Sequence, residues 1–112
     1  MNLQDIIQNL GLKVLTAPAN FSAVRPTGGY AADLLSCVMA GAKSGNIWVT
    51  LQAHINIVAI ASLTETCAVI ITEDAQLAPE VLAKANEQGV ILLGTPEPTY
   101  RVVGKLWELG VR

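Results

Sequence analysis

The hydrophobic positions of this chain change period several times, and each change marks a new predicted element. Residues 3–10 carry an apolar stripe at helical spacing, and Gly11 follows as a residue that commonly ends a helix. The next apolar segments are short and contain β-branched residues. They predict a strand over 13–16 and a second, weaker strand over 21–24.

The middle of the chain begins with a helical pattern over 30–42, where the apolar residues share one broad face, and Gly45 ends it. The segment 46–52 is rich in β-branched and aromatic residues and is typical of a strand. Residues 55–63 are apolar at spacings that fit either a helix or a strand. We predict a helix, because the connection before this segment is too short for the turn that another strand would need.

The second half of the chain repeats the same alternation. Residues 67–72 form a continuous apolar run, which is typical of a strand covered on both faces. The clearest helix spans 78–89, with a proline near its first position and a glycine at its end. A further buried strand is predicted over 90–93 and a closing helix over 97–110.

Alternating strands and helices with short connections are typical of a domain with a parallel sheet. We therefore expect the α/β class, in a three-layer α/β/α arrangement with a mainly parallel sheet of about four to five strands. The closing helix has two apolar stripes, and one of them can pack on the sheet. The other contains Tyr100, Val103 and Trp107 and predicts a subunit interface; the alternative is that Trp107 only covers the edge of the sheet.

The composition narrows the choice of partners. The chain has 112 residues, of which 52% are hydrophobic and 14% charged, and its net charge is −2 at pH 7. This balance lacks the basic face that nucleic-acid binding requires. A small domain cannot bury so much apolar surface within one subunit, so we expect a homodimer.

The sequence shows no pattern for membrane insertion, secretion or metal binding. No apolar run approaches the roughly 18 residues of a membrane span, and the first residues do not have the pattern of a signal peptide. Cys37 and Cys67 lie far apart without metal-ligand spacing, and Cys37 is expected to act as a small hydrophobic residue on its helix. We expect a cytoplasmic protein with no membrane contact, no metal and no cofactor.

Candidate chemistry lies where the predicted strands end, because ligands of open parallel sheets bind beyond the carboxyl ends of the strands. The candidate ligand-binding residues there are Thr27, Gly28, Gly29, Gln52, His54, Asn56, Thr72 and Thr95. The two glycines allow a tight turn or a close backbone approach, and the helix after them offers free N–H groups to an anion. Asp33 is expected in the first turn of that helix, where its negative charge would already satisfy the helix dipole and so argues against a polyphosphate site. The alternative is that Thr27, Gly28 and Gly29 form a plain turn that binds no ligand.

The sequence contains no recognised catalytic arrangement. His54 is the only histidine, and no serine, cysteine or acid stands beside it at a known spacing. The segment 41–45 lacks the glycine-lysine pair of a phosphate loop and follows a helix rather than a strand. Glu73 and Asp74 are adjacent acids, which we expect in a solvated loop. No catalytic residue is therefore predicted.

The stretch "RPTGGYAADLLSCVMAGAKSGNIWVTLQAHINIVAIA", residues 25–61, resembles the DRTGG domain family. The most specific part is Thr27-Gly28-Gly29, followed by Asp33-Leu34-Leu35 and by the predicted strand and helix over 46–63. The leading Asp-Arg of the family motif is replaced by Arg25-Pro26, so a role of that acid–base pair does not transfer. The resemblance covers nearly the whole chain and implies one DRTGG-like α/β domain over residues 1–112.

The resemblance also implies a fold like the N-terminal domain of HPr kinase/phosphorylase. Members of the family occur in CBS-containing pyrophosphatases, in some phosphate acetyltransferases and as free-standing short proteins, and this chain resembles the last kind. Such modules are non-catalytic and often dimeric. No activity of its own is implied, because the kinase and pyrophosphatase active sites lie in other domains.

Three interpretations of function follow. The first is a homodimeric, non-catalytic regulatory or assembly domain that binds a small anionic metabolite or nucleotide at the carboxyl ends of the strands. The second is a structural partner subunit that docks on a larger enzyme or regulator and takes no small-molecule ligand. The third is a small enzyme that uses His54 as a general acid or base, for which the sequence offers no oriented partner group.

Overall fold

Five strands form one sheet in the computed structural model, which describes all residues from Met1 to Arg112. The order across the sheet is β1-β5-β4-β3-β2, with β2 to β5 parallel and β1 antiparallel to β5. The mainly parallel sheet predicted from the sequence is therefore confirmed. The strands are β1 (Lys13–Val14), β2 (Gly28–Ala31), β3 (Asn46–Thr50), β4 (Ala68–Ile71) and β5 (Leu92–Gly94).

Five α-helices and one short 3₁₀ helix connect or flank these strands. The α-helices are α1 (Leu3–Leu10), α2 (Leu35–Gly41), α3 (Asn56–Thr64), α4 (Pro79–Gln88) and α5 (Thr99–Glu108), and the 3₁₀ helix is η1 (Phe21–Ala23). The longest of them contain 10 residues, and none meets the length and hydropathy that a bilayer span requires.

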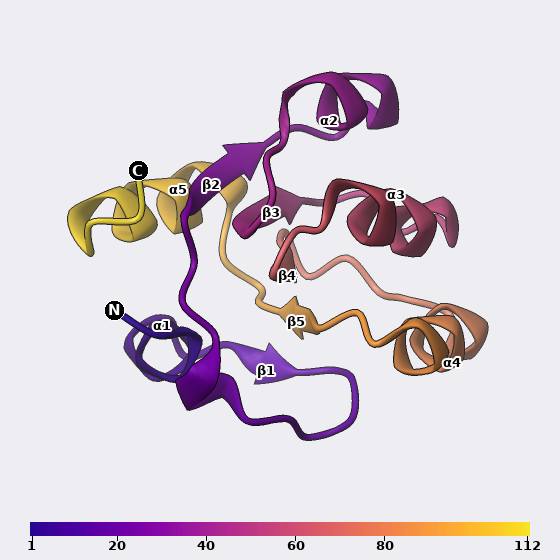
Figure 1. Ribbon diagram of the computed structural model, residues 1–112, viewed down its shortest axis with the longest axis horizontal. Coiled ribbons are helices and arrows are strands. Elements are labelled where there is room, and N and C mark those ends of the chain that lie inside the picture. The colour runs from indigo at the N-terminus through magenta and orange to yellow at the C-terminus, as the bar shows by residue number, and fades with distance from the viewer.

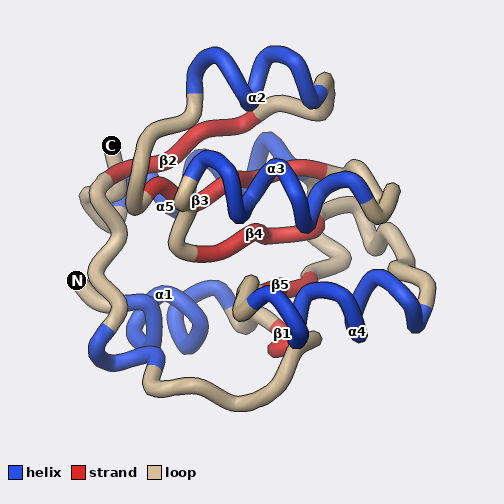
Figure 2. Tube along the Cα trace, turned by 45° about the vertical axis from the view of Figure 1, so that its right-hand side comes forward, coloured by secondary structure: helices blue, strands red, loops and turns tan.

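The helices cover both faces of the sheet (Figures 1 and 2). The helices α1 and α5 pack on one face, and α2, α3 and α4 pack on the other. Strand β3 explains this arrangement, because side chains alternate between the two faces of a strand. Ile47 and Val49 contribute to the core beneath α1 and α5, whereas Trp48 between them contributes to the core beneath the other three helices. The three-layer α/β/α arrangement is confirmed.

The segment 21–24, predicted as a weak strand, forms η1 and its C-cap residue Val24 instead. The N–H groups of Ala23 and Val24 donate to the carbonyl oxygens of Asn20 and Phe21 at 3.1 and 3.2 Å, so local bonds replace the pairing that a strand would need. Phe21 is buried and packs in the core with α1. In the sequence, a short apolar segment looks the same whether it forms a strand or a short helix that buries one side chain.

Gly28 and Gly29, predicted as a turn, begin strand β2. They pair with Asn46 and Ile47 of β3, and neither has a positive φ. A Cβ atom on Gly28 would lie 3.3 Å from the carbonyl oxygen of Arg112, closer than an ordinary contact. The glycine therefore leaves space for the end of the chain, which packs beside β2.

The helix predicted over 30–42 begins only at Leu35, because Tyr30 and Ala31 continue β2. The hydroxyl of Tyr30 donates to the carbonyl oxygen of Cys37 at 3.1 Å and so joins the strand to the helix that follows it. Asp33 consequently lies before α2 rather than in its first turn. The predicted helices near residues 55–63, 78–89 and 97–110 agree with α3, α4 and α5 apart from their terminal residues.

The connections after β4 and β5 leave the sheet on opposite sides. The segments β2-α2-β3, β3-α3-β4 and β4-α4-β5 all place their helix on one face, whereas the chain after β5 continues into α5 on the other face. A switch point of this kind leaves a crevice between adjacent strands, and ligands of open α/β sheets bind there.

Candidate functional site

The predicted site residues lie at two opposite edges of the sheet. Those that follow parallel strands at the carboxyl edge are Gln52, His54, Asn56, Thr72 and Thr95. Thr27, Gly28 and Gly29 lie at the amino end of β2. The prediction that all of them approach one edge was wrong, because it placed the glycines after a strand rather than at the start of one.

The residues at the amino edge are held by their own chain. The Thr27 hydroxyl donates to the carbonyl oxygen of Ser44 at 2.9 Å and accepts from Asn46 Nδ2 at 3.2 Å. A Cβ atom on Gly45, which has φ 81°, would lie 2.7 Å from the Thr27 methyl carbon. These contacts join the start of β2 to the loop before β3, and they use the only proton that the Thr27 hydroxyl could donate to an anion.

Asp33 occupies the carboxyl edge beside β2 and β3. Its Oδ1 accepts from the Thr50 hydroxyl at 2.8 Å and from the Leu51 N–H at 2.9 Å. The Thr50 side chain is fully buried, so the carboxylate satisfies a hydroxyl that water does not reach. This part of the edge is already filled by an anion of the protein itself.

Gln52, His54 and Asn56 form a local chain of hydrogen bonds before α3. Gln52 Oε1 accepts from the His54 N–H at 3.2 Å, and His54 Nδ1 accepts from the Asn56 N–H at 3.0 Å. The imidazole therefore satisfies a backbone donor at the beginning of the helix, with its own proton on Nε2. No carboxylate is hydrogen-bonded to it.

The loops after β4 and β5 are bound to each other at the switch point. The N–H of Glu73 donates to the Glu97 carbonyl oxygen at 2.9 Å, and the N–H of Asp74 donates to the Thr95 carbonyl oxygen at 3.1 Å. Glu73 Oε2 accepts from the N–H of Thr99, the first residue of α5, at 2.7 Å. Glu73 is exposed in a loop, as expected from the sequence, and its carboxylate in addition caps the N-terminus of α5.

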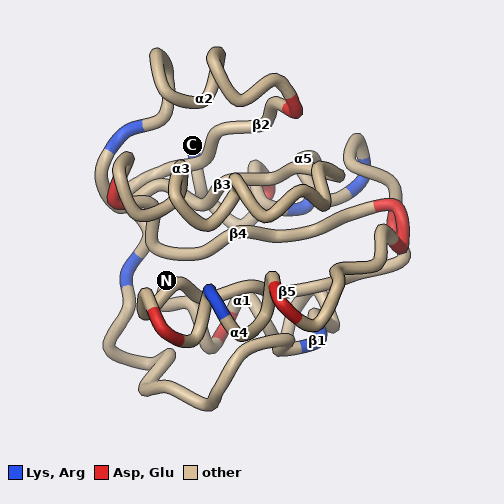
Figure 3. Tube along the Cα trace, turned by 90° about the vertical axis from the view of Figure 1, so that its right-hand side faces the viewer, with Lys and Arg blue, Asp and Glu red and all other residues tan.

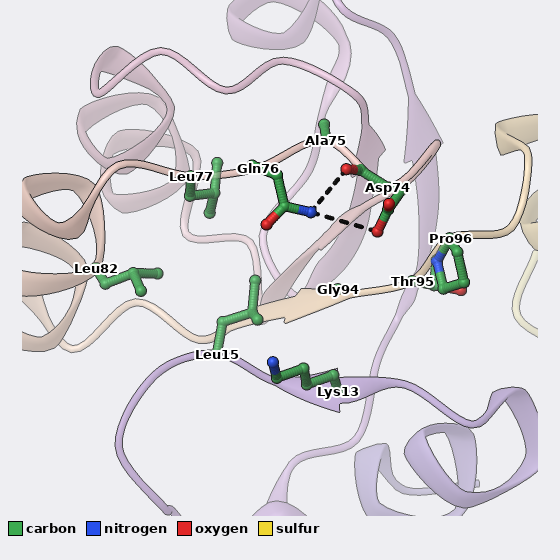
Figure 4. A pocket seen from close by; sticks show the side chains of 10 residues that line it. All are labelled: Lys13, Leu15, Asp74, Ala75, Gln76, Leu77, Leu82, Gly94, Thr95 and Pro96. Atoms are coloured by element: carbon green, nitrogen blue, oxygen red, sulfur yellow. Dashed lines mark hydrogen bonds between the residues drawn. The ribbon is translucent and has the colours of Figure 1, made fainter.

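A pocket of about 260 Å³ opens beside this joint. Figure 4 shows the Asp74–Leu77 loop on one side, Lys13 and Leu15 on the other, and the end of β5 between them. The pocket lies where β1 runs antiparallel to β5, because Lys13 pairs with Gly94. Its lining residues are Lys13, Leu15, Asp74, Ala75, Gln76, Leu77, Leu82, Gly94, Thr95 and Pro96.

The pocket combines an apolar wall with two charged groups that have no ionic partner. The two ion pairs of the molecule, Lys84–Glu87 at 3.7 Å and Arg101–Glu97 at 3.2 Å, include neither Lys13 nor Asp74. Gln76 Nε2 donates to the carbonyl oxygen of Asp74 at 2.9 Å and approaches its Oδ1 at 3.3 Å. One amide thus orients the carboxylate while its second oxygen stays available.

Lys13 and Gln76 were not predicted as site residues, and Asp74 was expected only in a solvated loop, where it is indeed exposed. Lys13 reaches the pocket only because β1 is antiparallel, which brings the beginning of that strand to the carboxyl edge of the others. Glu73 and Asp74 have φ values of 60° and 57°, in the left-handed region that non-glycine residues seldom adopt. A pair of adjacent acids directly after a buried strand was the one visible signal.

The two cysteines differ in their surroundings. Cys37 is exposed on α2, contrary to the expectation that it serves as a small hydrophobic residue. Burial raises the pKa of the Cys67 thiol from 9.0 to about 11, and a backbone hydrogen bond lowers it in part.

No group of three or more His, Cys, Asp or Glu side chains is arranged to hold a metal ion. The charged residues are few and scattered, with an adjacent acidic pair after β4 (Figure 3).

Comparison with known proteins supports the fold. No protein-family model and no curated protein matches the chain. A solved structure is similar: the CBS and DRTGG domains of the regulatory region of Clostridium perfringens pyrophosphatase, complexed with the activator diadenosine tetraphosphate. The TM-score is 0.73 and the sequence identity 15%, over 89% of this chain and 43% of the other. The chain thus has a DRTGG-like fold and spans less than half of the length of that solved regulatory chain.

Proposed function

We propose that this chain is a non-catalytic regulatory domain that binds a nucleotide-like small molecule in the pocket between β1, β5 and the β4–α4 loop. The observation that carries the proposal is the pocket itself, which opens beside the switch point and contains an unpaired lysine and an unpaired aspartate. The regulatory region similar in fold was solved with a nucleotide activator, which supports the same class of ligand.

The lining determines the chemistry of the ligand. The Lys13 ammonium suits a phosphate or carboxylate, and the Asp74 carboxylate suits a donor such as a ribose hydroxyl or an amino group. Leu15, Leu77 and Leu82 form an apolar wall against which a planar ring can pack. A volume of about 260 Å³ is near the lower limit for small-molecule sites, so a group of nucleoside or mononucleotide size is expected rather than a dinucleotide.

Charge also argues against a polyphosphate. Asp33, Glu73, Asp74 and Glu97 all follow strands at this edge, and Lys13 is the cation that lines the pocket. A ligand with several negative charges would meet these carboxylates, whereas a single phosphate can be neutralised by Lys13. The non-catalytic part of the proposal rests on the engaged groups: His54 and Glu73 each satisfy a helix N-terminus, and Asp33 holds the buried Thr50 hydroxyl.

The test is a titration with adenosine 5′-monophosphate, followed by calorimetry and by thermal unfolding at fixed protein concentration. A ligand at about 100 times its dissociation constant stabilises the folded state by roughly 2.7 kcal/mol, which raises the Tm of a domain of this size by several degrees. Adenosine and inorganic phosphate, tested separately, show which half of the molecule the pocket holds. Guanosine 5′-monophosphate tests the choice of base.

Two substitutions connect the titration to the pocket. Lys13→Met removes the ammonium and is expected to weaken binding of the monophosphate but not of adenosine. Lys84→Met is the matched control, because Lys84 lies on the exposed side of α4 and its surface ion pair with Glu87 contributes little. No stabilisation by any of these probes, or equal losses in both variants, would contradict the proposed ligand site and favour the docking subunit that takes no ligand.

A further inference from the structure

The outer face of α5 exposes aromatic side chains on both sides of a glycine. Tyr100 is 92% exposed and Trp107 58% exposed, and Val103 beside them is 37% exposed. These are the residues that the sequence predicted at an interface. Gly104 lies between Tyr100 and Trp107, and the surface is hollowed there, bordered by Tyr100, Arg101, Val103, Lys105, Trp107 and Glu108.

Nothing within the chain requires glycine at position 104. The residue is in the interior of a helix, it has no positive φ, and a Cβ atom on it would meet no other atom within 4 Å. Glycine is less favourable in a helix interior than every residue except proline. A glycine in that position allows another backbone to approach the helix closely, and no other element of this chain lies there.

We propose that this face of α5 binds the same face of a second copy of the chain, with the two helices antiparallel across a two-fold axis at Gly104. The proposal is independent of the ligand pocket. It commits to a second copy because the charges and the apolar groups of this face are complementary to themselves under that symmetry, and not under a parallel arrangement.

The distribution of side chains around the helix shows this complementarity. Successive residues are rotated by about 100°, which places Tyr100 and Trp107 on one side of Gly104 and Arg101 and Glu108 on the other. An antiparallel two-fold arrangement brings like sides together, so aromatic side chains meet aromatic side chains. A parallel arrangement would place the aromatic side of one helix against the charged side of the other.

The same symmetry pairs opposite charges. With a rise of about 1.5 Å per residue and the axis at Gly104, Arg101 lies within one residue's rise of Glu108 of the partner subunit, and the contact occurs twice. Glu108 has no ion pair within its own chain, whereas Arg101 holds Glu97 through Nη1 at 3.2 Å. The second guanidinium nitrogen, Nη2, makes no hydrogen bond within the chain and can reach a second carboxylate.

Trp107 is already oriented in the single chain. The guanidinium of Arg112 lies over its ring at 5.2 Å from the ring centre, and Arg112 Nε donates to the Trp107 carbonyl oxygen at 3.1 Å. An exposed tryptophan held in one position loses less side-chain entropy on association than a free one. This arrangement favours a contact surface over a simple cover for the sheet edge.

The first test is sedimentation equilibrium of the whole chain with and without Gly104→Gln. The wild-type protein is expected to be dimeric at about 100 μM, and the variant monomeric, because a glutamine side chain prevents close approach of the helices. Thermal unfolding separates this result from misfolding: Gly104→Gln removes no contact within the chain and replaces glycine by a better helix former, so its Tm is expected to be unchanged or higher at concentrations where the wild type is monomeric. A monomeric wild type or a dimeric variant would overturn the proposal.

The second test is a charge reversal that defines the direction of the helices. Arg101→Glu is expected to raise the dimer dissociation constant by at least about tenfold, because it faces Glu108 of the partner subunit. The double variant Arg101→Glu/Glu108→Arg restores both cross-subunit pairs and is expected to restore most of the dimer affinity. Arg25→Glu, which makes the same charge change outside α5, is expected to leave the dissociation constant within about twofold. An Arg101→Glu protein that stays dimeric, or a double variant no better than the single one, contradicts the antiparallel register.

Discussion

Asp33 and Asp74 lie at the same edge of one sheet, each in the connection after a strand, and they have opposite surroundings. Asp33 accepts from the Thr50 hydroxyl and from the Leu51 N–H, so the end of β3 depends on its carboxylate. Asp74 is approached only by the amide of Gln76, two residues away, and borders a pocket with an unpaired lysine. The first carboxylate completes the fold, and the second is available for other contacts.

The difference between these two aspartates cannot be read from residue type, charge or exposure. Both are acidic, exposed and placed after a strand. The number of buried or backbone donors that each carboxylate satisfies distinguishes them. A polar group at the ligand-binding edge of an α/β sheet is therefore a candidate for ligand binding only when no group of the chain already satisfies it.

The largest expected effect is that of Asp33→Ala. The substitution leaves the fully buried Thr50 hydroxyl without its acceptor, and we expect a loss of about 2 kcal/mol in the free energy of unfolding. The Tm should fall by roughly 8 °C. Urea unfolding measures the loss. Asp33→Asn keeps one acceptor oxygen and should lose less than half as much; equal losses would mean that the Thr50 bond is unimportant.

A smaller loss is expected for Glu73→Ala. The carboxylate that accepts from the Thr99 N–H disappears, and removal of such a group at a helix N-terminus costs about 1 kcal/mol. Glu80→Ala serves as the control, since Glu80 is an acid in the first turn of α4 that makes no hydrogen bond to a backbone N–H. Calorimetric unfolding of the two variants measures the difference. An equal loss of unfolding free energy in Glu80→Ala and Glu73→Ala would contradict the assignment of Glu73 as a cap.

The partly buried thiol of Cys67 is expected to make the free energy of unfolding depend on pH. Its pKa is about 11 in the folded protein and 9.0 without burial, so the unfolded thiol loses its proton first as the pH rises. Ionisation of this thiol leaves stability unchanged below about pH 8 and lowers it as the pH rises through 9 toward 11, by at most about 0.8 kcal/mol at pH 9.5. Urea unfolding from pH 8 to 10.5 measures the slope. Cys67→Ala should remove this part of the alkaline slope; identical slopes in both proteins would contradict it.

The smallest effect on stability is expected for Asp74→Asn. Its carboxylate satisfies no buried donor, and asparagine tolerates the φ of 57°, so the free energy of unfolding should change by less than about 0.5 kcal/mol. The same variant should weaken binding of adenosine in the titration proposed above, because the hydrogen-bond acceptor for the sugar or base is altered. A loss of stability comparable to that of Asp33→Ala would remove the distinction between the two aspartates.

The spacing of apolar residues predicted most of the helices and strands and the fold class. It did not predict the pocket. The all-apolar segment of β4 and the two stripes of α5 are properties of single elements, so they are visible in the sequence. The pocket depends on how β1 pairs with β5, which no local pattern records. The glycines at the start of β2 were misread because close packing against the C-terminal residues and a tight turn select the same residue type.

Glu73 links the two proposed surfaces through a single peptide bond. It holds the first residue of α5, and the next residue, Asp74, borders the pocket. If occupancy of the pocket alters that hold, the dimer and the monomer must differ in ligand affinity by the same factor by which the ligand alters dimerisation. Protein concentration then becomes a variable of every ligand titration, and a binding curve that shifts on dilution would report this reciprocity.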